Sequence, residues 1–530
     1  MRVLASDEVS RIETEGASRA DTPASLLVQR AGYAVAQFCL AHFKFQSVCV
    51  VCGNGDHGSY GIAAAQVLSG IAEQVSAVVL AKDANALSAE AAAICDSLAT
   101  EPLWVSEEGD FKYEAVQQAL EAELIIDAVA QSRFKASLQG TARKAVEAIN
   151  QASGIVVSIG VPSGVEPDSS VPVHEGGSEA VFAHGVITFV APNPAHVFGR
   201  LTAGPIAVSE LGVQPSLVSH ETGLSVVTAQ EVRITFPARP DEAHKGDFGH
   251  VLVIGGALDQ AGGAALAGIA ALRTGAGLAT IACPKSSQPT IAGFAPELMT
   301  EGLAETSAGA LALSARDKTV ELLAKADAVV LGRDTPRDDE TAQFMRWLIG
   351  NCAVPLVLHD IGLPDMSTHR VEKSDDNRLR VYILDAEEAA AFLGIDVGDL
   401  HTDTVDAARR IATQTNSCIV LKGLRTIVAG RSGETWISMT GSSALAKHGC
   451  DDALCGIIAA ALAVPRPNRP ALLRELDVAS AVYLHGLAGD LARDIFHENT
   501  LLATDLLETL SDAFRDCELQ SDRGLFYLRK

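Results

Sequence analysis

The residues of this sequence best placed for chemistry lie between Thr440 and Ala463, in the stretch TGSSALAKHGCDDALCGIIAAALA. Its turn, Gly449-Cys450-Asp451-Asp452, runs directly into an apolar helical pattern. A glycine turn that opens a helix presents backbone N–H groups and the positive end of the helix dipole, and together these bind anions. Asp452 could then take a proton from a hydroxyl whose phosphate acceptor those groups hold. By itself the pattern more commonly marks an N-cap at Asp451 or Asp452.

Lysines beside glycines indicate where a phosphate could be held. Lys422-Gly423 closes the apolar run SCIVLKG, which places an ammonium group where parallel sheets bind ligands. Lys245-Gly246 precedes the run GHVLVIGG, and that lysine is equally consistent with a solvated side chain. Together with Asp452, these lysines predict a phosphate-handling site built from loops of one sheet.

A second glycine loop lies near the N-terminus. Gly53-Asn54-Gly55-Asp56-His57-Gly58 follows the strand pattern FQSVCVVC and precedes a helical pattern, with Asp83 near the end of the next strand. This placement fits a dinucleotide-binding loop, and it fits a tight strand-to-helix turn without a ligand equally well. His57 could act as a base or a ligand, although a lone histidine beside a turn is more often a bystander.

The elements that must position these residues form two alternating series of strands and helices. Residues 1–45 are expected to be helical, and the runs QVSAVVLA, AELIIDAVA, SGIVVSIGV and GVITFVAP are expected strands. The second series opens at HVLVIGG, contains the hairpin pattern TIVAGRSGETWISMT, and ends in two helical segments. Alternation of this kind predicts an α/β fold with two open parallel sheets. The expected domains are 1–212 and 241–530, joined by a connection over 213–240.

Bulk composition excludes several classes of protein. With 530 residues the chain is too long for one core, and 48% hydrophobic but only 5% aromatic residues favour helices packed on parallel sheets. A formal net charge of −25 argues against nucleic acid or an anionic membrane as a partner. No apolar run reaches the ~18 residues of a membrane span, and the N-terminus lacks a signal-peptide pattern. Cytoplasmic localisation is therefore expected.

The ten cysteines show no disulfide spacing. Cys49 and Cys52 lie in a valine-rich strand pattern rather than at a helix start, so we predict buried thiols rather than a redox pair.

Five motifs in this order make the resemblance specific: HKGDFGHVLVIGG, AALRTGAGL, APELM, VLKG and GCDDALCGIIAAAL. They resemble the ribokinase-like ADP/ATP-dependent NAD(P)H-hydrate dehydratases. Arg30 in RAG, the loop Gly53 to Gly61, IIDA and VPSG resemble the Rossmann-like NAD(P)H-hydrate epimerase domain. The chain therefore resembles the bifunctional NAD(P)H-hydrate repair family over nearly its whole length.

The resemblance implies specific roles. In that family the dehydratase phosphorylates the hydrate hydroxyl from ADP or ATP, with Mg²⁺, and eliminates phosphate to restore NAD(P)H, while the epimerase interconverts the hydrate epimers with a potassium ion. Asp452 stands at the catalytic aspartate, and Asp127 resembles a potassium ligand. The nucleotide side corresponds to Lys422, Gly423, Gly449, Cys450 and Asp451. The substrate sides correspond to Gly262, Asp334, Asp385, Asn54, Asp56 and His57. Members of the family often form homo-oligomers.

Several positions depart from the family pattern. The epimerase loop GxGNNGGDG has Asp56 and His57 in place of its paired asparagines, and the catalytic aspartate of DIPSG aligns with Gly160. Since loss of a positioned acid or base removes about 10²–10⁴ in rate, we expect little or no epimerase activity. In the dehydratase half, Asp334 and Asp385 add charge on the hydrate side, and Asp451 replaces a glycine where phosphate would lie.

Three functions remain open from the sequence. The first is hydrate dehydration by the C-terminal half with a silent epimerase half. The second is a catalytically silent nucleotide-binding scaffold or regulator. The third is a ribokinase-like small-molecule kinase that uses Asp452 as a base on another alcohol.

Overall fold

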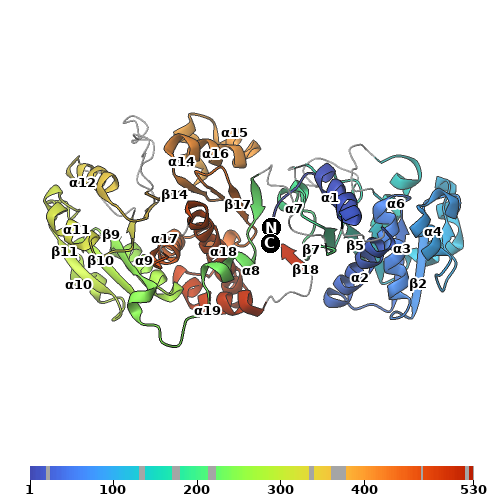
Figure 1. Cartoon of the computed structure of the whole chain (residues 1–530), viewed down its shortest axis with the longest axis horizontal. Coiled ribbons are helices and arrows are strands. Elements are labelled where there is room, and N and C mark those ends of the chain that lie inside the picture. Colours follow the sequence, from blue (N-terminus) through green and yellow to red (C-terminus); the bar gives the residue numbers. More distant parts are fainter. Residues whose placement is uncertain are drawn as a thin grey trace. The chain divides into compact units, whose positions relative to one another are not determined.

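The computed structural model describes residues 1–19, 24–130, 138–169, 180–212, 223–258, 260–332, 339–359, 378–466, 470–519 and 525–528. The chain divides into two compact units, one formed by Met1–Thr222 with Asp522–Arg529 and the other by Gly223–Ser521 with Lys530 (Figure 1). Each unit has its own sheet and its own apolar core. The predicted two-domain α/β fold is confirmed.

The first unit is built on a sheet in the order β18-β7-β6-β5-β4-β1-β2-β3, which is parallel except where β18 meets β7. Its central strands are apolar and buried, as expected for a parallel sheet covered on both faces. The strands are β1 (Ser47–Cys52), β2 (Gln74–Val79), β3 (Leu103–Trp104), β4 (Leu124–Ala128), β5 (Ile155–Ile159), β6 (Gly185–Phe189), β7 (Ile206–Ser209) and β18 (Leu525–Leu528). The helices are α1 (Ser6–Arg19), α2 (Ala24–His42), α3 (Asp56–Leu68), α4 (Ala89–Cys95), α5 (Glu114–Leu120), α6 (Gly140–Gln151) and α7 (Pro194–Phe198).

The second unit has a larger sheet in the order β11-β10-β9-β12-β13-β14-β15-β16-β17-β8. It is parallel from β11 to β15, and the predicted hairpin is present as the antiparallel pair β16–β17. The strands are β8 (Leu224–Val226), β9 (His250–Ile254), β10 (Leu278–Pro284), β11 (Met299–Leu303), β12 (Ala328–Leu331), β13 (Leu356–His359), β14 (Arg380–Leu384), β15 (Cys418–Leu421), β16 (Thr426–Ala429) and β17 (Thr435–Ser438). The helices are α8 (Ala229–Thr235), α9 (Ala261–Thr274), α10 (Gln288–Ala292), α11 (Arg316–Leu323), α12 (Asp339–Asn351), α14 (Ala386–Leu393), α15 (Val397–Thr402), α16 (Thr404–Thr415), α17 (Cys450–Ala463), α18 (Ala471–Phe496) and α19 (Ala503–Leu519).

Two short strands place the domain boundaries differently from those expected from the sequence. Within the predicted connection 213–240, β8 pairs with β17 and α8 packs on α18, so residues 223–240 belong to the second unit. After the two predicted final helices, α18 and α19, the strand β18 pairs antiparallel with β7 in the first unit. Both strands pair with partners about 200 or more residues away, so no local pattern marks them.

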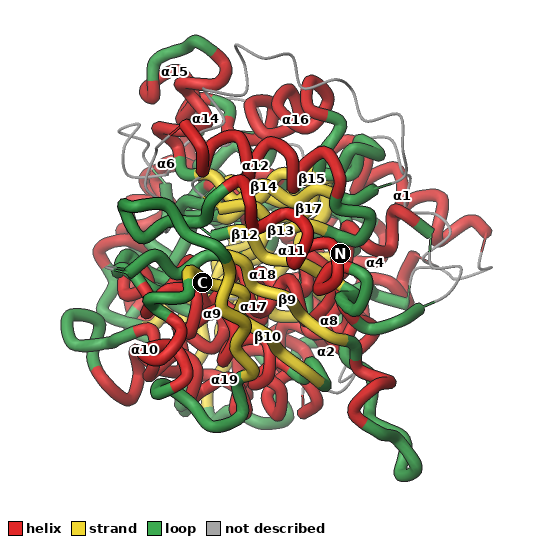
Figure 2. The backbone as a smooth tube through the Cα atoms, turned by 90° about the vertical axis from the view of Figure 1, so that its left-hand side faces the viewer, coloured by secondary structure: helices red, strands yellow, loops and turns green. Residues whose placement is uncertain are grey.

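Helix α17 organises the second unit because it is apolar on nearly every side. All its residues except Asp451 are buried, and it packs against α9 and over β9, β12 and β13, which are among the yellow strands near the middle of Figure 2. The two helices lie so close that a Cβ atom at Gly456 would overlap the Ala267 carbonyl oxygen. This tight packing fixes where the first turn of α17 lies.

The cysteine prediction is confirmed. All ten thiols are free and buried, and both Cys49 and Cys52 lie inside β1. Burial raises the pKa of the Cys49 thiol to about 12, which keeps it protonated and unreactive. Among the described residues, no helix combines the length and apolarity needed to cross a bilayer.

Candidate functional site

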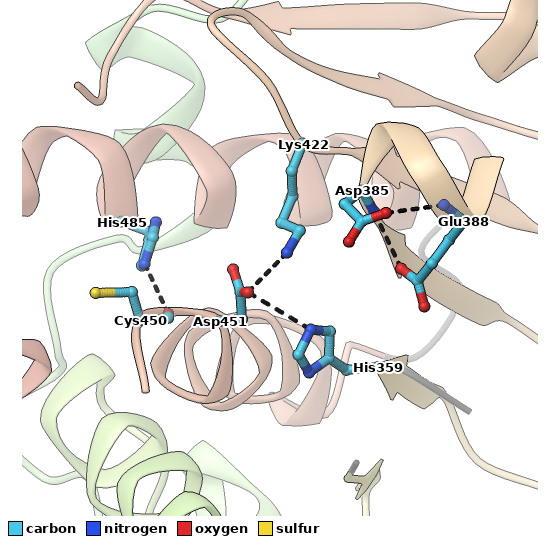
Figure 3. A network of polar contacts seen from close by, with 7 residues as sticks. All are labelled: His359, Asp385, Glu388, Lys422, Cys450, Asp451 and His485. Atoms are coloured by element: carbon cyan, nitrogen blue, oxygen red, sulfur yellow. Dashed lines mark hydrogen bonds and ion pairs between the residues drawn. The ribbon is translucent and has the colours of Figure 1, made fainter. Parts of the chain in front are cut away.

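Three neighbouring strands of the second sheet deliver polar side chains to one edge. His359 is the last residue of β13, Asp385 directly follows β14, and Lys422 directly follows β15. Because β13, β14 and β15 are parallel, their carboxyl ends meet at the same edge, where Figure 3 shows these side chains near the start of α17.

The start of α17 is held by a glycine turn and a histidine. Gly449 is the N-cap in the left-handed region, at φ 92°, and a Cβ there would lie 2.8 Å from Leu266 Cδ1, so both backbone and packing favour glycine. His485 on α18 donates from Nε2 to the Cys450 carbonyl oxygen at 3.0 Å. Burial lowers the pKa of His485 to about 4, so this histidine is a neutral positioning group.

The first turn of α17 carries an ion pair to β15. Lys422 Nζ lies 2.6 Å from Asp451 Oδ2, and His359 Nε2 lies 3.6 Å from the same oxygen (Figure 3). Burial by itself would raise the pKa of Asp451, but His359 and Lys422 outweigh it and hold that pKa well below its usual range. Asp451 is therefore an anion near neutral pH.

Asp452 lies in the same first turn and is buried, with 8% of its surface exposed. The predicted lysine, the glycine turn and the predicted catalytic carboxylate thus come together at one end of α17. The exposed Gly423 follows Lys422 at the same edge. A lysine, a helix start and a buried carboxylate can respectively hold a phosphate, neutralise its charge and accept a proton.

In this unit, the residues predicted to face the hydrate are Asp385, Gly262 and Asp334. Asp385 caps α14: it accepts from Glu388 N at 2.8 Å, and Asp385 N donates to Glu388 Oε2 at 3.1 Å. This capping box gives Asp385 a structural task that the sequence comparison with the family did not suggest. Gly262 lies in the first turn of α9 with open space beside its Cα. Asp334 lies outside the described residues, and all three roles remain predictions.

In the first unit, the glycine loop is required by close packing. Gly53 N donates to the Ala128 carbonyl at 2.9 Å, and a Cβ at Gly53 would overlap the Val129 carbonyl oxygen. A Cβ at Gly58 would overlap Gly53 in the same way. The glycines are therefore explained by the turn from β1 to α3, while Asn54 and Asp56 are exposed. A ligand role for Asn54 and Asp56 remains a prediction.

His57 is buried in the first turn of α3 and lies over Gly160. A Cβ at Gly160, whose φ is 75°, would overlap His57 Cε1, so the imidazole fills the space of any side chain at position 160. Burial lowers the pKa of His57 to about 4, and its Nδ1 atom is buried without a hydrogen-bond partner in the described chain. The ring borders a cavity of about 20 Å³, lined also by Ser6, Glu13 and Thr188, which has room for about one water molecule.

Asp127 is fully buried at the end of β4 and its oxygens are occupied by protein donors. Oδ1 accepts from Ser163 Oγ at 2.6 Å and Val129 N at 3.3 Å, and Oδ2 accepts from Ser158 Oγ at 2.8 Å and Ser163 N at 2.9 Å. Burial raises the pKa of Asp127 in spite of these bonds. With about four acceptor positions filled, Asp127 does not fit the potassium ligand that the family resemblance implied.

Among the described residues, no group of three or more His, Cys, Asp and Glu side chains is arranged to hold a metal ion.

Three histidines with clear positions were not assigned roles from the sequence. His359 and His485 flank the start of α17, and His196 donates from Nε2 to the Gly160 carbonyl at 2.8 Å while Asn193 N donates to its Nδ1. His485 and His196 each lie in an apolar stretch of sequence, where no motif marks them; only the fold shows what they contact.

Family models match both units. The model described as NAD(P)H-hydrate dehydratase matches residues 251–512, and the model described as YjeF-related protein N-terminus matches residues 24–195. The first match contains Lys422 and α17, and the second contains the His57 loop and Asp127.

Relatives match across both units at once. The bifunctional NAD(P)H-hydrate repair enzyme of Moorella thermoacetica is 29% identical over 98% of this chain and 97% of its own length. The enzyme of the same name from Escherichia coli K12 is 26% identical over 95% of this chain and 92% of its own. The ADP/ATP-dependent NAD(P)H-hydrate dehydratase of Bacillus subtilis, co-crystallized with ATP/Mg²⁺, is 27% identical, with a TM-score of 0.47 over 55% of this chain and 98% of that chain. With both domains matched in the same order, the chain belongs to the family of bifunctional NAD(P)H-hydrate repair enzymes.

Proposed function

We propose that the second unit dehydrates hydrated NAD(P)H at the expense of ADP or ATP, with Asp452 as the general base. One observation carries this proposal: Lys422 from the end of β15 reaches the first turn of α17, which holds the buried Asp452. In this proposal the phosphate-binding cation and the proton acceptor lie at the same end of α17.

In the proposed reaction, Asp452 takes the proton of the hydrate hydroxyl as that oxygen attacks the terminal phosphorus of the nucleotide. The bond from phosphorus to the nucleotide's bridging oxygen breaks, and the shortened nucleotide leaves with those electrons. The phosphorylated carbon then loses phosphate and the adjacent carbon loses a proton, which restores NAD(P)H. Lys422 and the N–H groups of α17 would hold the phosphates, and Mg²⁺ would accompany them, because it commonly binds phosphates and one or two carboxylates.

The test compares the wild type with Asp452→Asn in the conversion of hydrated NADH to NADH, with ADP and with ATP. The wild type is expected to convert the hydrate, and Asp452→Asn to lose about 10²–10⁴ in rate because the base is gone. Circular dichroism of both proteins controls for folding. An unchanged rate in Asp452→Asn would remove Asp452 from the mechanism.

The second candidate function is a nucleotide-binding protein without catalysis. The contact that favours it is the ion pair between Lys422 and Asp451, which already occupies the lysine proposed to hold phosphate. A protein that binds nucleotide without turning over the hydrate would show ADP binding by calorimetry and no conversion in the same preparation. A ribokinase-like kinase would transfer phosphate to at least one of a panel of other alcohols. Both of the other functions predict no such transfer.

We also propose that the first unit does not interconvert the hydrate epimers. Position 160 has no carboxylate, the His57 ring fills that space, and the adjacent cavity has room for about one water molecule. In full-length Asp452→Asn, where dehydration no longer consumes substrate, the epimers are expected to exchange no faster than in buffer. Chromatography of the two epimers over time measures this, and exchange at a normal enzymatic rate would refute the proposal.

The acidic charge and the absence of a membrane-spanning helix in the described chain support a small-molecule partner rather than nucleic acid or a membrane. We infer that the cytoplasm, which is reducing, is the compartment; the ten free thiols are consistent with it.

A further inference from the structure

The Asp451 carboxylate lies at the edge of the second sheet, where nitrogen groups from two strands approach it. Its Oδ2 atom lies 2.6 Å from Lys422 Nζ and 3.6 Å from His359 Nε2, so two nitrogen groups from different strands converge on one oxygen (Figure 3). The Asp451 side chain is 32% exposed, the Lys422 side chain 24% and the His359 side chain 6%. A pair held this far out of water interacts more strongly than a surface pair.

The position of Asp451 in the helix adds to this attraction. It is the second residue of the 14-residue helix α17, where the helix dipole is positive and backbone N–H groups lack partners within the helix. Lysine, histidine and helix start are together the environment that a phosphate group requires. Here a side chain of the protein supplies the negative charge.

The charge of this internal anion is stable. His359 and Lys422 hold the pKa of Asp451 below its usual range against the opposing effect of burial, so the carboxylate stays ionised through the neutral pH range. His359 comes from β13 and Lys422 from β15, two strands separated only by β14, and this spacing lets both reach the same oxygen. The buried Nδ1 of His359 has no hydrogen-bond partner among the described residues. Within the described chain, the polar contact of that imidazole is with Asp451.

We propose that Asp451 is a built-in counter-ion that occupies the place of a nucleotide phosphate beside Lys422, so that nucleotide binds only by displacing it. The proposal rests on the proposed function, in which Lys422 contacts the nucleotide. Asp451 is in this sense a specificity-determining residue. A phosphate ligand binds there only if it interacts with Lys422 and the helix start more favourably than the Asp451 carboxylate does.

Calorimetric titration of ADP at fixed Mg²⁺ tests the displacement. Asp451→Asn keeps the shape of the side chain and removes its charge, and it is expected to bind ADP at least about tenfold more tightly than the wild type. Asp451→Gly serves as a second variant that removes the side chain altogether. Glu321→Gln is the matched control, because it breaks another lysine–carboxylate pair of the same unit, Lys318–Glu321 at 3.2 Å on the exposed face of α11. Its affinity for ADP is expected to equal that of the wild type.

A second readout follows the lysine itself. Trace acetylation followed by mass spectrometry is expected to modify Lys422 severalfold faster in Asp451→Asn, because its ammonium group is released from the ion pair, with Lys318 unchanged. Equal or weaker ADP binding in both Asp451 variants, or an unchanged reactivity of Lys422, would overturn the proposal.

The two proposals fail in different ways. If Asp452→Asn abolishes dehydration while the Asp451 variants bind ADP no more tightly, the proposed function stands and the displacement of Asp451 falls. If the Asp451 variants bind ADP more tightly and the wild type converts no hydrate, the displacement stands and the proposed dehydratase activity falls.

Discussion

At the scale of single residues, the carboxylates of this chain show how little a residue type says about its task. Asp385 caps a helix, Asp127 accepts four hydrogen bonds from protein donors, and Asp451 pairs with Lys422. Asp452 is buried in the first turn of α17, which Lys422 also reaches. Each role follows from the partners that the fold supplies, because solvent exposure and neighbouring charge decide what a carboxylate does.

The close approach of the His57 ring to Gly160 leads to a prediction about stability. Gly160→Ala is expected to destabilise the first unit by about 1–3 kcal/mol, because the new Cβ overlaps the imidazole. The positive φ of Gly160 adds about 1–2 kcal/mol. In a His57→Ala background the overlap is gone, so Gly160→Ala should cost at least about 1 kcal/mol less. Urea unfolding of the four proteins measures this coupling, and strictly additive effects would show that the ring and position 160 do not share space.

At the scale of elements, the contact between α9 and α17 is what places the site. Both helices are rich in alanine and glycine, so their backbones approach closely, and α17 covers β9, β12 and β13. The small side chains that make these helices inconspicuous in the sequence thus allow the first turn of α17 to reach the end of β15.

Gly456→Ala tests this contact. Its Cβ would overlap the Ala267 carbonyl of α9 and lie 2.8 Å from Ala270 Cβ, so we expect a loss of about 1–3 kcal/mol and a reduced dehydration rate as α17 shifts. Gly350→Ala in α12 is the control, because its Cβ meets open space; a helical Gly→Ala change there should be neutral or stabilising by up to about 1 kcal/mol. Thermal unfolding compares them, and equal melting temperatures for the two variants would contradict the prediction.

At the scale of the whole molecule, the chain forms two units, each with its own mainly parallel sheet and its own core. The strand β8 enters the second sheet beside β17, and the chain returns at β18 to the first sheet beside β7. The first unit is therefore built from both ends of the sequence. A boundary drawn from local patterns misses this, because each of these strands has only three or four residues and depends on a distant partner for its hydrogen bonds.

The amino-acid sequence was enough to predict two α/β domains, the series of strands and helices, the family resemblance, and the stretch from Lys422 to Asp452 in which the dehydratase site is proposed. These follow from apolar periodicity and short motifs, which are local properties of the chain. Only the folded structure shows that Asp451 faces Lys422 and His359, that His57 fills the space over Gly160, and that Asp127 accepts four hydrogen bonds. Those facts depend on distances between residues about 30 to 100 positions apart, which are set by sheet register and helix packing rather than by any local pattern.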